Sequence, residues 1–319
     1  MKKRRTTIWI ALCTAAVCAV LAILLFTAVL PSIRFRRAKA LFEAGQYEEA
    51  ITTLESLNGY GDSETLILEC RYAMAMDLTA SGRYEEAAAA FEAMDGYQDS
   101  TERARAAYVS YEIAQISEAK VGDYVVFGAY EQDNDASNGK EAVEWQVLEK
   151  DGDSALLISR YALDCKPYHT PYVDVTWEDC SLRAWLNGPF MDDAFSENEQ
   201  DRIAYTVVTS ERNPRYPKTP AGSDTEDRVF LLGMAEVDRF LGSADAGQCQ
   251  PTAYANAQSA YADITTGNGN CLWWLRSPGI RPNAAAFVDS TGNISFHGYS
   301  VDHANTAVRP VIRIDTGSR

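Results

Sequence analysis

The chain has 319 residues, and hydrophobic residues make up 46% of them, enough for a sizeable core. Its formal net charge is −16 at pH 7. Residues 1–33 hold 4 of the 29 basic residues and no acidic ones, so the rest of the chain has a net charge of −20. A surface of that sign repels phosphate backbones, which argues against nucleic acid as a partner.

Residues 8–30, "IWIALCTAAVCAVLAILLFTAVL", carry no charge and are long enough as a helix to cross a lipid bilayer. We therefore predict a basic tail and transmembrane anchor over residues 1–33. The alternative is a cleaved signal peptide, but its apolar run is only about 7–15 residues long. Basic residues flank both sides, so charge counting does not orient the anchor. We expect the short tail to stay inside and the acidic body to lie outside the cell.

Two of the seven cysteines, Cys13 and Cys18, lie in this apolar run. The other five are too far apart in the sequence for a CxxC metal or redox motif. We interpret them as small buried thiols. A single disulfide is the alternative, and the sequence does not choose its pair.

Two stretches then match in register with a period of 37 residues: "AGQYEEAITTLESLNGYGDS" at 44–63 and "SGRYEEAAAAFEAMDGYQDS" at 81–100. Their apolar residues recur at helical spacing, and Asn-Gly or Asp-Gly ends each segment. The pattern resembles tetratricopeptide-type helical pairs. It predicts five helices over residues 34–118, three long and two short, with Tyr47 and Tyr84 buried at equivalent turns. We favour a stalk over a peptide-binding groove, because a groove needs more repeats.

Residues 119–319 change to short runs rich in β-branched and aromatic residues, which predict an α+β domain. A hairpin (121–130 and 143–150) and a third strand (154–163) are expected first, followed by two or three helices. One of these helices, at 181–188, is expected to end at Asn187-Gly188. The N-terminal strands should pair with the C-terminal ones, and "AVRPVIRI" (307–314) should close the sheet. Pro310 lacks an amide hydrogen, so we expect it at an unpaired edge or a bulge.

The polar hairpin loop offers Asp133, Asp135, Ser137 and Glu144 at calcium-loop positions 1, 3, 5 and 12. The glycine falls at position 7 instead of 6, and Glu144 belongs to a strand. A solvated hairpin tip is the favoured interpretation, with these residues as weak metal candidates.

The stretch "CLWWLRSPG" (271–279) follows a loop-rich segment, 243–270, of the kind that is often functional. Side chains alternate on a strand, so Trp273 should face the core, while Trp274 and Arg276 share the other face. Those two residues are candidates for a ligand-binding platform. The alternative is a structural salt bridge from Arg276 to a carboxylate such as Asp289.

Five motifs occur in order between about 120 and 315: "FGAYEQDNDASNGKEAVEWQVL", "LRAWLNGPFMDDAF", "DRVFLLG", "WWLRSPG" and "AVRPVIRI". They resemble an uncharacterised bacterial family, domain of unknown function 6273. That family is distantly similar to the C-type-lectin-like fold of formylglycine-generating, sulfatase-modifying enzymes, and often follows a membrane anchor and helical repeats. The resemblance implies a C-type-lectin-like domain over residues 119–319 and a single-pass protein of the bacterial cell membrane.

The resemblance does not carry the enzymes' catalysis to this chain. Those enzymes bind copper through a closely spaced cysteine pair, whereas Cys249 and Cys271 are 22 positions apart. "HGYSVDH" places His297, Asp302 and His303 within seven residues, but without an evident third ligand we expect no metal. No phosphate loop, nucleophile elbow or dinucleotide fingerprint occurs, so we expect no cofactor.

Two classes of function remain. The first is a cell-envelope binding protein whose lectin-like domain recognises a glycan or a protein, with Trp274, Arg276 and the 297–303 cluster as candidate contacts. The second is an enzyme of unknown reaction with a site near Cys271 and His297–His303. The missing catalytic set favours the first.

Overall fold

The computed structural model describes residues 2–262 and 268–317. Residues 1–111 and 112–319 form two units, and each is described by itself. Part of the loop-rich segment expected at 243–270 lies outside the described residues.

An apolar helix begins the first unit, running through α1 (Lys2–Leu24), the π-helical turn η1 (Leu25–Val29) and α2 (Leu30–Glu43). Within the described residues it is the single helix that is long and apolar enough to cross a membrane, and its apolar window is not buried by the rest of the chain. The anchor expected from the uncharged run is therefore supported by length and composition.

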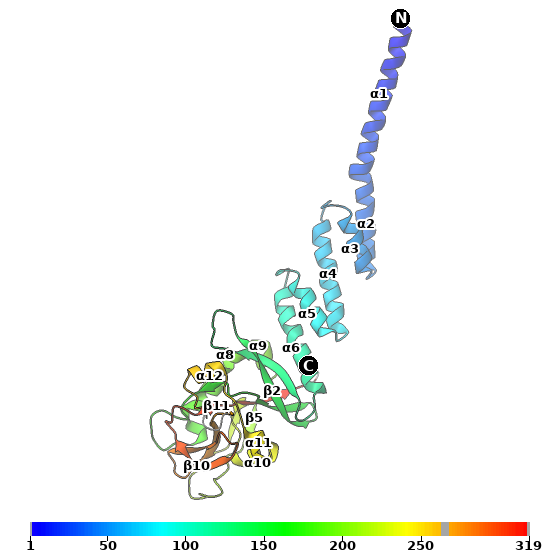
Figure 1. The fold of residues 1–319 in the computed structure, drawn as a ribbon. Coiled ribbons are helices and arrows are strands. Elements are labelled where there is room, and N and C mark those ends of the chain that lie inside the picture. The colour runs from blue at the N-terminus through cyan, green and yellow to red at the C-terminus, as the bar shows by residue number, and fades with distance from the viewer. Residues whose placement is uncertain (1, 263–267, 318–319) are drawn as a thin grey trace. The chain divides into compact units, whose positions relative to one another are not determined.

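Short and long helices then alternate: α3 (Tyr47–Glu55), α4 (Ser63–Ala80), α5 (Tyr84–Glu92) and α6 (Ser100–Glu118), which continues into the second unit. Together with α2 they are the five helices predicted (Figure 1). Buried residues recur 37 positions apart, as in Ala50 and Ala87 or Leu54 and Phe91. Tyr47 and Tyr84 lie at equivalent helix starts but are half-buried, which corrects the expectation of full burial.

The second unit combines two five-stranded sheets with short helices. One sheet has the order β1-β2-β3-β12-β7 and the other β10-β9-β8-β11-β4, while β5 and β6 form a separate pair. The strands are β1 (Tyr124–Tyr130), β2 (Glu141–Asp151), β3 (Ser154–Ser159), β4 (Asp164–Cys165), β5 (Thr206–Val208), β6 (Thr225–Asp227), β7 (Val229–Phe230), β8 (Trp273–Pro278), β9 (Ala284–Val288), β10 (Ile294–Ser300), β11 (Ala307–Val308) and β12 (Val311–Asp315).

The predicted hairpin and third strand are confirmed as β1, β2 and β3, each antiparallel to the next. Burial alternates along β2, as expected for a strand with one face on the core. The pairing of N-terminal with C-terminal strands is also confirmed, because β12 pairs with β3, with Ile312 opposite Leu157.

The segment 307–315 serves both large sheets and does not close either of them. Its first part, β11, lies between β8 and β4, and its second part, β12, lies between β3 and β7. Pro310 occupies the link between β11 and β12, and its carbonyl accepts a hydrogen bond from Ser159 N. The proline falls where the chain leaves one sheet for the other, so its missing amide hydrogen costs no ladder bond, as expected for an unpaired position.

Short helices connect the strands: η2 (Trp177–Asp179), α7 (Ser181–Trp185), η3 (Leu186–Phe190), α8 (Met191–Ala194), α9 (Glu197–Gln200), α10 (Met234–Phe240), α11 (Ala244–Gly247) and α12 (Ala253–Ala257). The helix expected to end at Asn187-Gly188 instead continues through the π-helical turn η3 into α8. Asn187 holds this turn, since its side chain donates to Arg183 O and Val229 O. The core between these elements contains the fully buried rings of Trp145, Tyr168, Trp273 and Trp274.

Candidate functional site

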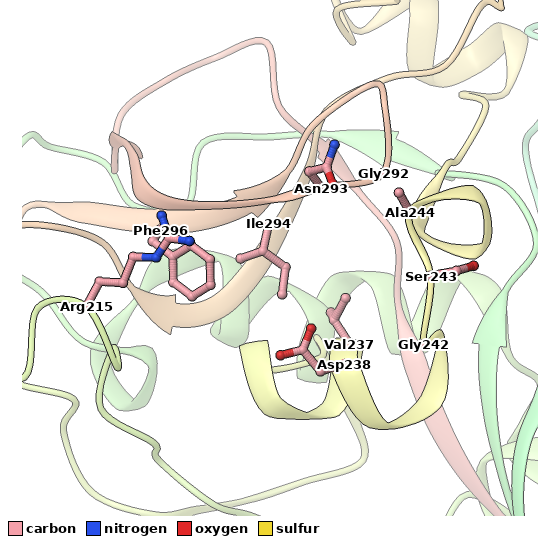
Figure 2. Close-up of a pocket in the computed structure, with 10 residues that line it drawn as sticks. All are labelled: Arg215, Val237, Asp238, Gly242, Ser243, Ala244, Gly292, Asn293, Ile294 and Phe296. Carbon is pink, nitrogen blue, oxygen red and sulfur yellow. The ribbon is translucent and has the colours of Figure 1, made fainter.

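A groove with a cavity volume of about 380 Å³ lies beside α10 and β10. Figure 2 shows its lining, which comes from three parts of the second unit: the loop before β6, the α10–α11 segment and the start of β10. The lining residues are Arg215, Val237, Asp238, Gly242, Ser243, Ala244, Gly292, Asn293, Ile294 and Phe296. We call this the α10–β10 groove. Its volume falls in the range of about 300–1,000 Å³ that is usual for ligand sites.

One end of the groove is fixed by a close contact between two backbones. A Cβ on Gly292 would lie 1.7 Å from Ala244 O, and one on Gly247 would lie 2.4 Å from Gly292 O. Gly292 also has a φ of +84°, which side chains rarely adopt. Asp289 shapes this β9–β10 turn, because its carboxylate accepts from Thr291 N and Asn293 N. The turn therefore stands against α11 only because both contact positions are glycine.

The other end is built around the buried side chain of Asn213. Its Nδ2 donates to Pro278 O (2.9 Å) and Phe296 O (2.8 Å), and its Oδ1 accepts from Arg215 N (3.0 Å). This fully buried amide fastens the loop to β8 and β10. The Arg215 guanidinium then lies 4.0 Å from the centre of the Phe296 ring, a cation–π contact that limits where the charge can go.

Arg215 and Asp238 give the groove one positive and one negative group. Both side chains are exposed, and neither forms an ion pair with any residue that the structure describes. Ile294 and Phe296 add apolar surface, while Ser243 and Asn293 add hydroxyl and amide groups. This combination suits a polar ligand that carries hydrogen-bonding groups around an apolar face.

Residues 152–316 match the family model described as a domain of unknown function, DUF6273. The chain belongs to this family. No curated protein and no solved structure matches it. Every residue of the groove lies within the matched part of the DUF6273 domain, whereas β1 and β2 lie before it.

In the DUF6273 domain, Trp274 and Arg276 are buried, with exposed fractions of 0% and 5%. Trp274 Nε1 donates to Lys166 O, and Arg276 donates to the backbone oxygens of Leu231 and Thr209. The platform expected from the sequence is therefore wrong for these residues, because both faces of β8 are covered.

The structure instead contains the alternative, a structural salt bridge from Arg276. Its partner is Glu236 on α10, contacted by both guanidinium Nη atoms, and not Asp289. Glu236 also accepts from Gly233 N, the residue before α10. Arg276 thus positions the helix that carries Val237 and Asp238 into the groove.

The His297, Asp302 and His303 cluster does not converge in space. His297 is exposed and is hydrogen-bonded to the Tyr216 hydroxyl at 2.7 Å, next to the loop that carries Arg215. His303 stacks on Tyr299, with ring centres 4.3 Å apart, and its Nδ1 is 2.9 Å from Thr306 Oγ1. Burial lowers the pKa of His303, although nearby Asp302 opposes that shift.

Tyr299 in turn stacks on Phe287, with ring centres 4.3 Å apart, so rings from β9, β10 and the loop after β10 form a row of three. The His303 ring at the end of this row also packs edge-on against the Trp274 ring, with ring centres 6.5 Å apart. Two of the predicted site residues, Trp274 and His303, are therefore neighbours in the structure, where they pack against each other. None of the three residues of the 297–303 cluster belongs to a metal-ligand group within the described part of the chain.

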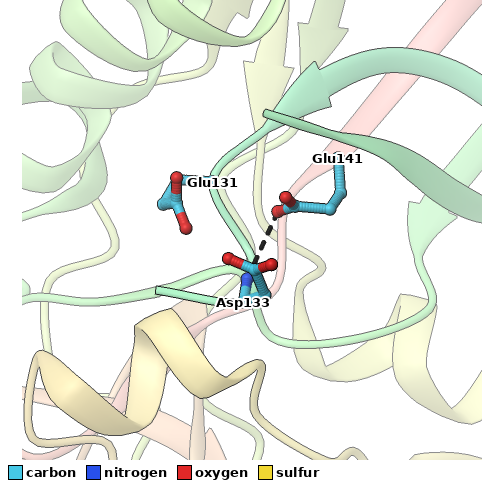
Figure 3. A group of neighbouring side chains, drawn as sticks. All are labelled: Glu131, Asp133 and Glu141. Carbon is cyan, nitrogen blue, oxygen red and sulfur yellow. Dashed lines mark hydrogen bonds between the residues drawn. The ribbon is translucent and has the colours of Figure 1, made fainter. Parts of the chain in front are cut away.

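Of the weak calcium candidates, Glu144 is paired with Arg160 at 2.9 Å. Asp133, Asp135 and Ser137 instead bond to one another, because Asp133 accepts from Asp135 N and Asp135 accepts from the Ser137 hydroxyl. A different group, Glu131, Asp133 and Glu141, brings its carboxylates within 4.8 Å of one another (Figure 3). Glu141 already accepts from the backbone N–H groups of Gln132 and Asp133. These carboxylates close the hairpin loop.

Sequence reasoning missed Arg215, Asp238 and Phe296. The segment "RNPRYP" has no strand or helix period, and nothing in it says that Asn213 is buried. The one usable signal was the Asp-Ser-Thr-Gly-Asn turn at 289–293, which forms the wall of the groove.

Proposed function

We propose that this chain is a membrane-anchored binding protein of the bacterial cell envelope. Residues 8–30 hold it in the membrane as a single pass, and the bulk of the chain lies outside. The helices over residues 34–118 act as a tetratricopeptide-like stalk. The DUF6273 domain has a C-type-lectin-like fold, distantly similar to sulfatase-modifying enzymes, and recognises a glycan or a protein without catalysis.

The observation that carries this proposal is the pair of unmatched charges across the α10–β10 groove. Arg215 is held on the Phe296 ring at 4.0 Å, and Asp238 projects from α10. A guanidinium and a carboxylate both bond sugar hydroxyls or peptide groups, and the apolar surface between them suits the flat face of a sugar ring or side chain.

The test is a binding screen of the full-length chain in detergent against glycans and cell-wall fragments. Arg215→Ala and Asp238→Ala should each weaken binding about tenfold, equivalent to ~1.4 kcal/mol. Arg281→Ala is the matched control, because Arg281 is exposed and lies outside the groove. Binding that survives both groove changes would place the ligand elsewhere, and the absence of any bound fragment would contradict the proposed function.

A further inference from the structure

Cys249 and Cys271 meet in the core of the second unit, although 21 residues separate them in the sequence. Their exposed fractions are 3% and 0%. Cys271 N donates to Cys249 O at 2.7 Å, which places the two Cα atoms roughly 5–6 Å apart. A disulfide needs a separation of about 4.4–6.8 Å. The Cys249 sulfur lies 3.7 Å from Arg160 O and 3.6 Å from Gln250 O. Each of the two thiols also shifts the pKa of the other, as expected for neighbouring sulfur atoms.

A buried arginine without a carboxylate partner stands beside this pair. Arg309 is 3% exposed, and its Nε donates to Ser159 O at 2.9 Å. Its Nη1 is buried and has no hydrogen-bond partner within the described residues. The guanidinium lies 5.2 Å from the centre of the Trp273 ring. Its positive charge favours the thiolate form of both cysteines and so acts to lower the pKa of each. A buried cation requires a nearby negative charge, and a thiolate can supply it.

The energetics of the two thiols agree with one shared negative charge. Burial alone would raise the pKa of Cys249, but the hydrogen bond from Cys271 and the Arg309 charge together lower it to about 7. The pKa of Cys271 is raised, because its proton holds that hydrogen bond and because it is buried. Cys165 and Cys180 are also buried, but burial raises the pKa of each to about 12.

We propose that Cys249 and Cys271 form a reversible thiol–disulfide couple whose reduced state is stabilised by Arg309. The Cys249 thiolate attacks one sulfur of a small external disulfide, which forms a mixed disulfide and releases one small thiolate. Cys271 then gives its proton to solvent and attacks the Cys249 sulfur, releasing the second small thiolate. The protein thiols are oxidised, and the external disulfide is reduced to two thiols. This inference is independent of the proposed binding function.

Oxidation removes the negative charge and leaves the Arg309 guanidinium without a partner. The reduced state is therefore favoured more than in an ordinary cysteine pair, and the disulfide is correspondingly easy to reduce. Arg309 is a positioning residue in this reaction, since it acts on the charge of the sulfur atoms and takes no part in bond exchange.

The experiment equilibrates the full-length chain in detergent with buffers of reduced and oxidised glutathione, starting from both redox states. After acid quenching and alkylation, digestion and mass spectrometry identify the crosslinked peptides. We expect a Cys249–Cys271 crosslink that is lost in Cys249→Ser and Cys271→Ser and kept in the buried controls Cys165→Ser and Cys180→Ser. A crosslink through a different pair, or none at any glutathione ratio, would overturn the proposal.

A second readout tests the role of Arg309. At pH 8, Arg309→Met should let the disulfide form at an oxidised-to-reduced ratio about tenfold lower, because the thiolate loses its stabilising charge. Arg309→Lys should restore most of the difference. If the arginine variants do not fold, the wild-type rate of oxidation decides: it should level off above about pH 7, whereas an ordinary thiol keeps accelerating past 8. An unchanged midpoint, or a rate that keeps rising, would exclude the Arg309 effect.

Discussion

The two units of this molecule hold their charged side chains by different means. In the helical unit, the two shortest ion pairs of the described residues are local: Arg83 pairs with Glu86 and Arg103 with Asp99, three and four residues apart. In the mixed unit, Arg183 reaches Asp227 and Arg276 reaches Glu236, each 40 or more residues away. The first kind of contact depends on local helix geometry, whereas the second exists only once the whole fold has assembled. Changes in the two units should therefore differ in size and reach.

The largest difference in stability between the two units should come from removing β12, the last strand of the mixed unit in the sequence. Deleting residues 308–319 removes β12 from between β3 and β7. We expect the tryptophan fluorescence transition of the mixed unit to vanish, while the helical unit keeps its far-ultraviolet circular dichroism. A truncated chain that retains a cooperative fluorescence transition would contradict the central position of β12.

Single buried rings in the mixed unit should come next. Trp273 is fully buried, donates to Gly247 O and lies under Arg309, so Trp273→Ala should cost about 3–5 kcal/mol of unfolding free energy. Because Trp274 is equally buried, Trp274→Ala should cost a similar amount. Urea titration followed by fluorescence measures both, with the half-buried Trp185→Ala as a milder control. A Trp274 variant as stable as wild type would return that ring to the list of ligand-contact candidates.

Removing a half-buried ring from the helical unit should cost less unfolding free energy than removing a buried ring from the mixed unit. Tyr47→Ala and Tyr84→Ala remove equivalent side chains that are only partly covered, and we expect about 1–2 kcal/mol for each, below the cost of a fully buried aromatic ring. Thermal melting followed at 222 nm gives the values. A large gap between the two variants would show that the equivalent turns are not equivalent in energy.

Acid should move the two units in opposite directions. The Tyr72 hydroxyl and Arg103 lower the pKa of Asp99, so this group stabilises the helical unit above its unfolded pKa and loses that effect as the pH falls through the folded value. Burial, with a smaller contribution from Glu199, raises the pKa of Glu112 to about 8. The folded mixed unit therefore holds a proton that the unfolded chain has released, and its stability falls as the pH rises from about 4.5 toward 8.

The measurement is the pH dependence of each transition, with fluorescence for the mixed unit and circular dichroism at 222 nm for the helical unit. Glu112→Gln should flatten the neutral-pH slope of the first, and Asp99→Asn the acid slope of the second. Slopes of the same sign in both units, or slopes that these variants leave unchanged, would refute the assignment.

The same contrast explains what the sequence could predict. The helices of the helical unit could be predicted almost completely, because the stop signals at Asn58-Gly59 and Asp95-Gly96 lie beside the helices that they end. The two glycines have φ values of 80° and 79°, which suit a helix end. The longer strands of the mixed unit, such as β1, β2 and β3, were also predicted, since alternation is local. The short strands β4, β5 and β6 were not. The groove and the cysteine pair were not. Arg215, Asp238 and Phe296 come from three separate segments, and Cys249 meets Cys271 only through the packing of β8.

The pairing of β3 with β12 also determines when the first sheet can form during synthesis. Leu157 lies opposite Ile312, and every residue between them must be made before that pair can close. At about 5–20 residues per second, β3 waits on the order of ten seconds for its partner. During that interval the apolar face of the β1–β2–β3 meander is uncovered on the nascent chain. A chaperone that shields this meander would therefore raise the yield of folded protein without changing the finished domain.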